Sequence, residues 1–140
     1  MRQQQIGFVA LALGIIGGLM VDALVDESAA KLVSGPLDGK VFAGELVDKE
    51  KGTGDKEEFY FKNGEFHSTA CEPYGFDGAP YSAVIKDGAL MFEARAVSPT
   101  HGNIVWKGVV RGDTLEGTAL WYKKEGADPD QLSFKAMFKP

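Results

Sequence analysis

The chain has 140 residues, a length that accommodates one domain. Hydrophobic residues make up 44% and charged residues 25% of the sequence, a composition that indicates a folded globular protein rather than a disordered one. The formal net charge of −5 argues against a nucleic-acid partner, because phosphate binding needs clustered lysines and arginines. Cys71 is the single cysteine, which excludes an internal disulfide and a multi-thiolate metal site.

The N-terminal region contains a long apolar stretch, Ile6–Val25, interrupted only by Asp22. Arg2 precedes the stretch, and a positive residue on that side predicts that the following chain crosses the membrane. Residues 1–30 fit a signal peptide, with small residues for cleavage near Ala23 or near Ala30, or a single transmembrane anchor of about 20 apolar residues. Both interpretations predict an extracytoplasmic location for the rest of the chain, either periplasmic or secreted.

Small residues recur at intervals of four within this stretch, at Ala10, Gly14 and Gly18. This spacing lets two helices pack closely in a bilayer. A retained anchor therefore predicts a membrane-protein partner, and the protein is then an accessory or structural subunit of a larger complex. Signal peptides are also rich in Ala and Gly, so both alternatives stay open.

Residues 31–39 are predicted to be a linker, and residues 40–140 to be one β domain. Beyond Gly39 the hydrophobic residues recur with a period of two, which is typical of strands with one apolar face. Eight segments show this alternation: 40–47, 57–62, 65–71, 81–86, 90–96, 104–111, 114–122 and 132–138.

Two-residue turns and longer links alternate between these segments. Asn63-Gly64, Asp87-Gly88 and Gly112-Asp113 are hairpin signals. The longer links are 48–56, 72–80, 97–103 and 123–131. Because successive connections of an up-and-down meander fall at opposite ends, we expect all tight turns at one end and all long loops at the other.

These features predict an all-β fold: an eight-stranded antiparallel up-and-down barrel preceded by one N-terminal hydrophobic helix. Closing the sheet removes the two exposed edges that a meander would otherwise leave. Small residues such as Gly108, Gly117 and Ala119 alternate with aromatic ones on the predicted inner face, as a barrel interior requires. A two-sheet sandwich is the alternative, but strict hairpin succession lacks its Greek-key crossover.

One segment carries a resemblance to a known group. Trp106-Lys107-Gly108-Val109-Val110-Arg111-Gly112-Asp113 leads into Leu115-Glu116-Gly117 and Trp121, and with the eight-strand meander it resembles the calycins: lipocalins, avidins and fatty-acid-binding proteins. The resemblance is architectural and covers residues 40–138. Lipocalins usually carry Gly-x-Trp at the first strand, whereas Gly39-Lys40-Val41-Phe42 has no Trp. The resemblance implies binding of a small apolar ligand in the barrel or at its loop-bearing mouth.

Catalytic and cofactor motifs are missing from the sequence. It shows no nucleophile elbow, phosphate loop or dinucleotide fingerprint, and no His pair at metal-ligand spacing. We therefore predict no cofactor, no metal site and no enzymatic activity. Cys71 and His101 fall on loops at the same end, and a nucleophile–base pair between them is the least favoured alternative.

The aromatic residues on the predicted inner face either fill the core or line an apolar cavity. We predict that the protein binds a small apolar ligand at the long-loop end. Aromatic rings would line the site, with His101 and Asp77 as polar orienting groups. The expected aromatic lining is Tyr74, Phe76, Phe92, Trp106 and Trp121.

Overall fold

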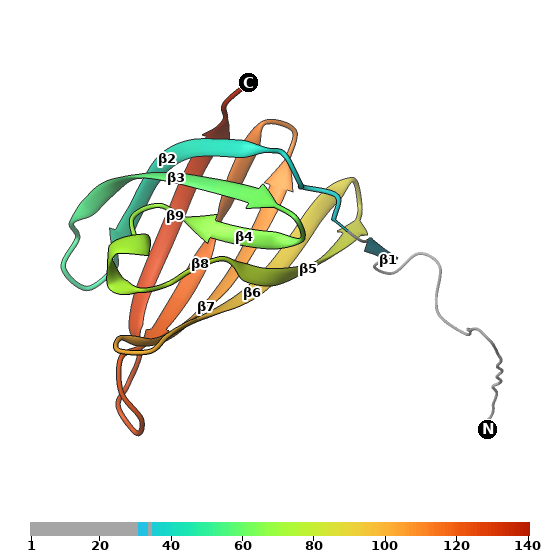
Figure 1. The fold of residues 1–140 in the computed structure, drawn as a ribbon. Coiled ribbons are helices and arrows are strands. Elements are labelled where there is room, and N and C mark those ends of the chain that lie inside the picture. Colours follow the sequence, from blue (N-terminus) through green and yellow to red (C-terminus); the bar gives the residue numbers. More distant parts are fainter. Residues whose placement is uncertain (1–30, 34) are drawn as a thin grey trace, which may run out of the picture. The chain divides into compact units, whose positions relative to one another are not determined.

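The computed structural model describes residues 31–33 and 35–140, which form nine strands and one short 3-10 helix (Figure 1). The expected hydrophobic helix, with Ala10, Gly14 and Gly18, lies outside the described residues. The elements are β1 (Lys31–Val33), β2 (Val41–Asp48), β3 (Gly54–Lys62), β4 (Glu65–Ser68), η2 (Glu72–Tyr74), β5 (Ala79–Lys86), β6 (Ala89–Ser98), β7 (Gly102–Arg111), β8 (Thr114–Tyr122) and β9 (Asp130–Phe138).

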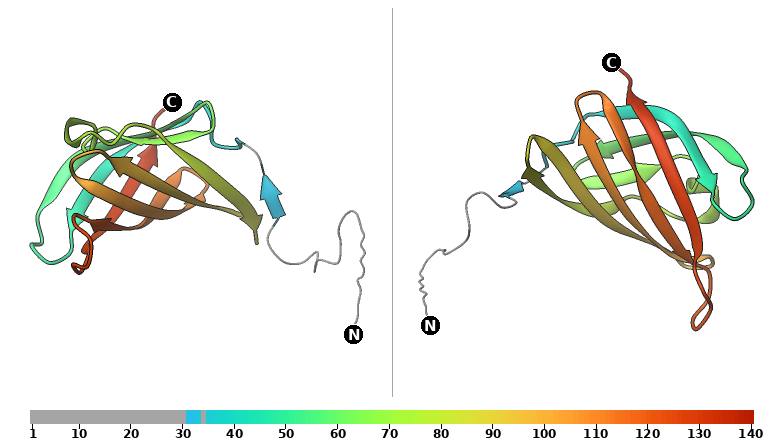
Figure 2. Two further views of the ribbon diagram at one scale, coloured as in Figure 1. Left: turned by 60° about the horizontal axis from the view of Figure 1, so that its bottom comes forward. Right: turned by 180° about the vertical axis from the view of Figure 1, so that it is seen from behind.

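Strands β2 to β9 form a closed antiparallel barrel, as predicted (Figure 2). Each strand pairs with its neighbours in the sequence, and β2 pairs with β9 over seven residue pairs, from Phe42↔Phe138 to Asp48↔Leu132. Pairing of the first barrel strand with the last leaves no second sheet layer, so the sandwich alternative is wrong. The described residues contain no helix long and apolar enough to cross a membrane.

The tight turns follow the hairpin signals. Asn63 and Asp87 have positive φ angles of 54° and 53°, and each is followed by a glycine that also has positive φ. Asn and Gly tolerate this left-handed backbone, which matches the twist of the flanking strands. The β6–β7 connection is shorter than expected: the strands extend to Ser98 and from Gly102, which leaves three residues in the turn.

The fourth strand also ends earlier than the alternation of residues 65–71 predicts. β4 stops at Ser68, and the chain turns through a Cys71 N–H to Ser68 C=O hydrogen bond of 3.1 Å into η2. Pro73 lies in the first turn of this helix, where its missing N–H costs nothing, whereas it would remove a donor from a continuing strand. The helix places Tyr74 at the long-loop end.

The middle of the barrel is filled by aromatic rings. Phe59 is fully buried and has ring centroids 5.9 Å from Trp106 and 4.9 Å from Phe134. Phe66 lies 5.0 Å from both Phe92 and Trp106. Aromatic pairs at these separations add about 0.5–1.5 kcal/mol each to the free energy of burial. The inward aromatic side chains are therefore mainly core, as one of the two interpretations of the sequence held.

Glycines on the inner face make room for this packing. A Cβ atom built on Gly117 would lie 2.0 Å from the Lys107 carbonyl oxygen and 2.7 Å from the Phe134 ring. Gly117 pairs with Gly108, so two strands approach closely where the large rings lie. Glycine at these positions lets the sheet curve tightly around its aromatic centre.

The tight-turn end of the barrel is closed by residues that precede β2. Leu37 is completely buried, and its N–H donates to the Tyr81 hydroxyl oxygen at 3.1 Å. Tyr81 in turn donates to Asp38 at 2.7 Å, and Asp38 also accepts the N–H of Gly64 in the β3–β4 turn. The stretch that was expected to be a linker thus contains β1, which lies next to β5 in the sheet, and a residue of the core.

Candidate functional site

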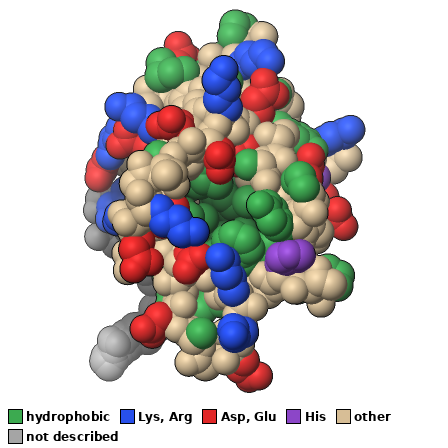
Figure 3. All heavy atoms as spheres, turned by 90° about the vertical axis from the view of Figure 1, so that its left-hand side faces the viewer, with side chains coloured by type: hydrophobic (Ala, Val, Ile, Leu, Met, Phe, Trp, Pro, Cys, Tyr) green, Lys and Arg blue, Asp and Glu red, His purple; other side chains and the backbone are tan. Residues whose placement is uncertain are grey.

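A cleft of about 530 Å³ opens at the long-loop end of the barrel. On that face, hydrophobic side chains lie in a hollow surrounded by charged ones (Figure 3). Leu46 on β2 and Leu132 on β9 form part of its floor. Each is the inward residue next to the end of its strand at the mouth, which is Asp48 on β2 and Asp130 on β9. The cleft is lined by Leu46, Asp48, Lys51, Thr53, Asp55, Ala70, Cys71, Tyr74, Thr100, His101, Trp121, Lys123, Asp130 and Leu132.

Aromatic side chains form one wall of this cleft. The half-buried Trp121 indole donates from Nε1 to the His101 carbonyl oxygen at 2.7 Å, which fixes its orientation. Tyr74, which is 46% exposed, packs edge-on against the Trp121 ring at 5.7 Å and against the His101 ring at 5.3 Å. Phe76 is buried and packs against Trp121 at 5.9 Å, so it supports this wall rather than lining the cleft.

A buried hydroxyl holds two of the mouth connections together. Ser98 donates to the Tyr74 carbonyl oxygen at 2.7 Å and accepts the backbone N–H groups of Thr100 and His101. The β6–β7 turn is thereby tied to η2. Because one hydroxyl satisfies three backbone groups, the positions of Tyr74 and His101 are coupled to each other.

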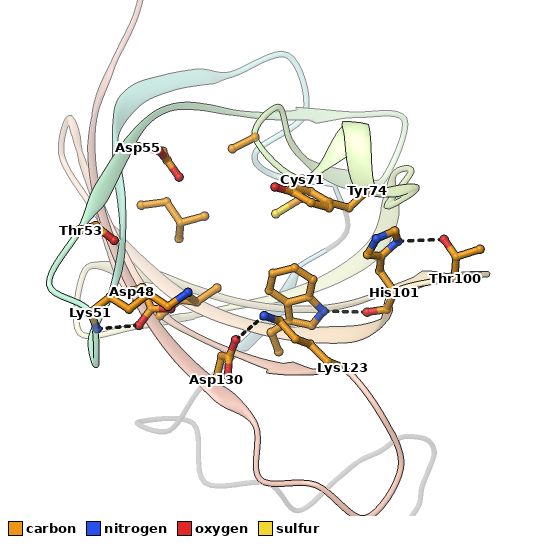
Figure 4. A pocket seen from close by; sticks show the side chains of 14 residues that line it. Asp48, Lys51, Thr53, Asp55, Cys71, Tyr74, Thr100, His101, Lys123 and Asp130 are labelled. Atoms are coloured by element: carbon orange, nitrogen blue, oxygen red, sulfur yellow. Dashed lines mark hydrogen bonds and ion pairs between the residues drawn. The ribbon is translucent and has the colours of Figure 1, made fainter.

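Charged side chains surround the opening (Figure 4). Lys123 lies 2.9 Å from Asp130 and its ammonium stands 4.5 Å from the centre of the Trp121 ring. Asp48 accepts the N–H groups of Glu50 and Lys51 at 3.0 Å, and these hydrogen bonds lower the pKa of the Asp48 carboxyl. Figure 4 shows Asp55 across the opening from Lys123 and Asp130.

A buried carboxylate lies behind the wall formed by residues 68–71. Glu57 is only 4% exposed, and it accepts the hydroxyl of Ser68 at 2.5 Å and that of Thr69 at 2.7 Å. It also accepts the backbone N–H groups of Glu58 and Ala70, both at 2.9 Å. Four donors to one carboxylate compensate for its burial and fix the segment that leads to the cleft.

The chemistry of Cys71 is that of a protonated thiol. Burial is the main cause that raises its pKa to about 11, against a lowering by the Ser68 hydroxyl and with a smaller raising by the Glu57 carboxylate. The His101 side chain interacts instead with the Thr100 hydroxyl, 2.8 Å from Nδ1, and with the Tyr74 ring. No hydrogen bond between Cys71 and His101 is present among the described residues.

The structure brings together three of the seven residues expected to bind a ligand: Tyr74, His101 and Trp121 line the cleft. Phe92 and Trp106 lie deep in the packed core and are 1% exposed. The alternation correctly places both on the inner face, but it does not report the depth of a residue along the barrel axis. Asp77 is exposed beside Phe76 and does not line the cleft.

Sequence reasoning missed the inward carboxylates of the mouth. β3 begins at Gly54 rather than near residue 57, so Asp55 and Glu57 continue the inner face of Phe59. The register confirms this, because Asp55 pairs with Leu46 and Glu57 pairs with Gly44, two inward positions of β2. Counting the alternation backwards from Phe59 would have found both acids.

No protein-family model, curated protein or solved structure matches the chain. Among residues 31–33 and 35–140, no group of three or more His, Cys, Asp or Glu side chains is placed to hold a metal ion. The eight-stranded closed barrel is compatible with the calycin architecture, and the site has to be interpreted from its own geometry.

Proposed function

We propose that the protein is a non-catalytic β-barrel that binds a small, largely apolar molecule in the cleft at its long-loop end. The observation that carries this proposal is an open cleft with a polar rim, in which the apolar floor of Leu46 and Leu132 adjoins the Trp121 ring. Small-molecule sites typically combine a concave apolar surface with a few polar groups. The resemblance to calycins supports the same function.

The packed core restricts where this ligand binds. Leu46 and Leu132 form the floor, and the next inward residue of β9 is Phe134, which contacts Phe59. The ligand therefore stays at the mouth rather than entering the barrel, and it has to be short or flat. A long extended chain does not fit beneath this floor.

A neutral apolar fluorescent probe, N-phenyl-1-naphthylamine, tests the proposal on the purified full chain. We expect saturable binding that Ala70→Phe weakens by about tenfold or more, because Ala70 lines the cleft and a phenyl ring there fills it. Ala127→Phe, on the exposed β8–β9 loop outside the cleft, is the matched control and leaves binding unchanged. Equal binding by both variants would place the probe elsewhere and refute the proposal.

We further propose that the barrel acts outside the cytoplasm, on the evidence of the apolar stretch at residues 6–25. The alternative is an accessory subunit that the same stretch anchors to a membrane complex through Ala10, Gly14 and Gly18. The mass of the mature protein from its own source separates them. A start at Leu24 or Lys31 removes the anchor and with it the alternative.

A further inference from the structure

The protein places one of its own ammonium groups in the cleft. The Lys123 ammonium stands 4.5 Å from the centre of the Trp121 ring and 2.9 Å from the Asp130 carboxylate. The face of an aromatic ring attracts cations, most strongly on tryptophan, and a carboxylate beside it adds a charge-assisted hydrogen bond. Trp121 and Asp130 therefore form a site whose chemistry suits an organic cation.

The balance of charges around the cleft also favours a cationic ligand. Asp48, Asp55 and Asp130 line it, and Glu57 lies buried behind its wall, against the ammonium groups of Lys51 and Lys123. Lys51 and Lys123 both interact electrostatically with Asp48. Asp55 forms no ion pair with the described residues. The other titratable side chains that line the cleft are Cys71, Tyr74 and His101.

We infer that the ligand of this cleft is a small amphipathic amine, whose apolar body lies on Leu46 and Leu132 and whose ammonium replaces that of Lys123 between Trp121 and Asp130. The inference rests on the proposed binding function and adds the charge of the ligand. Lys123 is half exposed, with 50% of its side chain accessible, so it can leave the site without disturbing buried structure. It acts as an internal competitor that a ligand must displace.

Three probes with one apolar body and different head groups test the charge: 3-phenylpropylamine, 3-phenylpropanol and 3-phenylpropionate. Titration calorimetry on the full chain at pH 7 should give the tightest binding for the amine, by about three- to tenfold over the alcohol. The carboxylate should bind weakest. The preference for the amine should shrink as salt rises, because the ion pair lies in a partly exposed cleft.

Lys123→Gln is the decisive variant, because it removes the competitor and keeps a side chain of similar length. Affinity for the amine should rise about threefold or more, whereas affinity for the alcohol should stay within twofold. Lys124→Gln, the neighbouring exposed lysine outside the cleft, is the matched control and should change neither. Asp130→Asn should remove most of the preference for the amine, with Asp128→Asn as its control.

The outcomes separate the two proposals. Equal binding of amine and alcohol, or a lower amine affinity in Lys123→Gln, overturns the inference and leaves the binding function intact. Binding of N-phenyl-1-naphthylamine in the cleft with no binding of any of the three head-group probes has the same meaning. Absence of binding by all four compounds overturns both.

Discussion

The two ends of the barrel are built from different chemistry. The tight-turn end is sealed by Leu37, which is fully buried, and by the hydrogen bonds of Tyr81 and Asp38. The long-loop end is open, with an apolar floor, an aromatic wall and a charged rim. The tight-turn end therefore buries its apolar side chains, whereas the long-loop end leaves Trp121 half buried and Tyr74 exposed. Stability of the barrel does not require aromatic rings to face solvent in this way.

The two tryptophans give the largest contrast between these regions. Trp106→Ala removes a side chain that is 1% exposed and contacts Phe59, Phe66 and Phe134. We expect the free energy of unfolding to fall by about 3–5 kcal/mol. Trp121→Ala, at the mouth, should cost about 1–2 kcal/mol, because its ring is already half in water. Urea titrations of both variants measure the difference, and equal losses would mean that the mouth is as integral to stability as the core.

A second contrast concerns the buried Glu57 carboxylate, behind the wall of the cleft. Glu57→Leu leaves the donors from Ser68, Thr69 and Ala70 without their acceptor, and we expect a loss of about 3 kcal/mol. Glu57→Gln keeps the one oxygen that accepts three of the four hydrogen bonds. The Ser68 hydroxyl can turn to accept a hydrogen bond from the new amide group. We therefore expect the free energy of unfolding of the Gln variant to fall by only about 1 kcal/mol. Chemical denaturation checks both values. A Gln variant as unstable as the Leu variant would show that the negative charge itself is needed.

The sealed end should respond to alkaline pH. Burial, assisted by the hydrogen bond to Asp38, raises the pKa of Tyr81 to about 12. Between the unfolded value of about 10 and this value the folded state holds a proton that the unfolded state has released, so stability falls as pH rises. Tyr81→Phe should cost about 1–2 kcal/mol at neutral pH and remove this extra decline. Thermal melts from pH 9 to pH 12 test it, and an unchanged pH slope in the variant would contradict it.

The smallest expected effect on stability is at Cys71, where the readout is chemical. With a pKa of about 11, the thiol is almost fully protonated at pH 8. Alkylation by iodoacetamide should be at least about 100-fold slower in the folded protein than in urea, because the thiolate is the reactive form. Rapid alkylation of the native protein would indicate an activated cysteine and reopen the enzymatic alternative.

Much of this fold could be predicted from the sequence because period-two alternation and hairpin turns are local signals. Thr114–Tyr122 matches the expected strand at both ends. The depth of each residue was not predictable, since it depends on register: Trp106 pairs with Ala119 in the core and Trp121 pairs with Ile104 nearer the mouth, although both share the inner face. Leu37 was missed because a single leucine among Gly, Pro and Asp has no periodic neighbours.

The alternation of short turns and longer loops has a consequence for how this protein can change. The loop residues that line the cleft belong to connections whose ends are held by strand pairing. The barrel itself is stabilised by the aromatic core and, at the tight-turn end, by the buried Leu37. Substitutions at exposed loop positions that line the cleft, such as Lys51, Thr53 and Lys123, can therefore alter which molecules are selected at little risk to folding. The sequence of each loop can therefore be varied separately, by evolution or in a library of variants, while the barrel is kept.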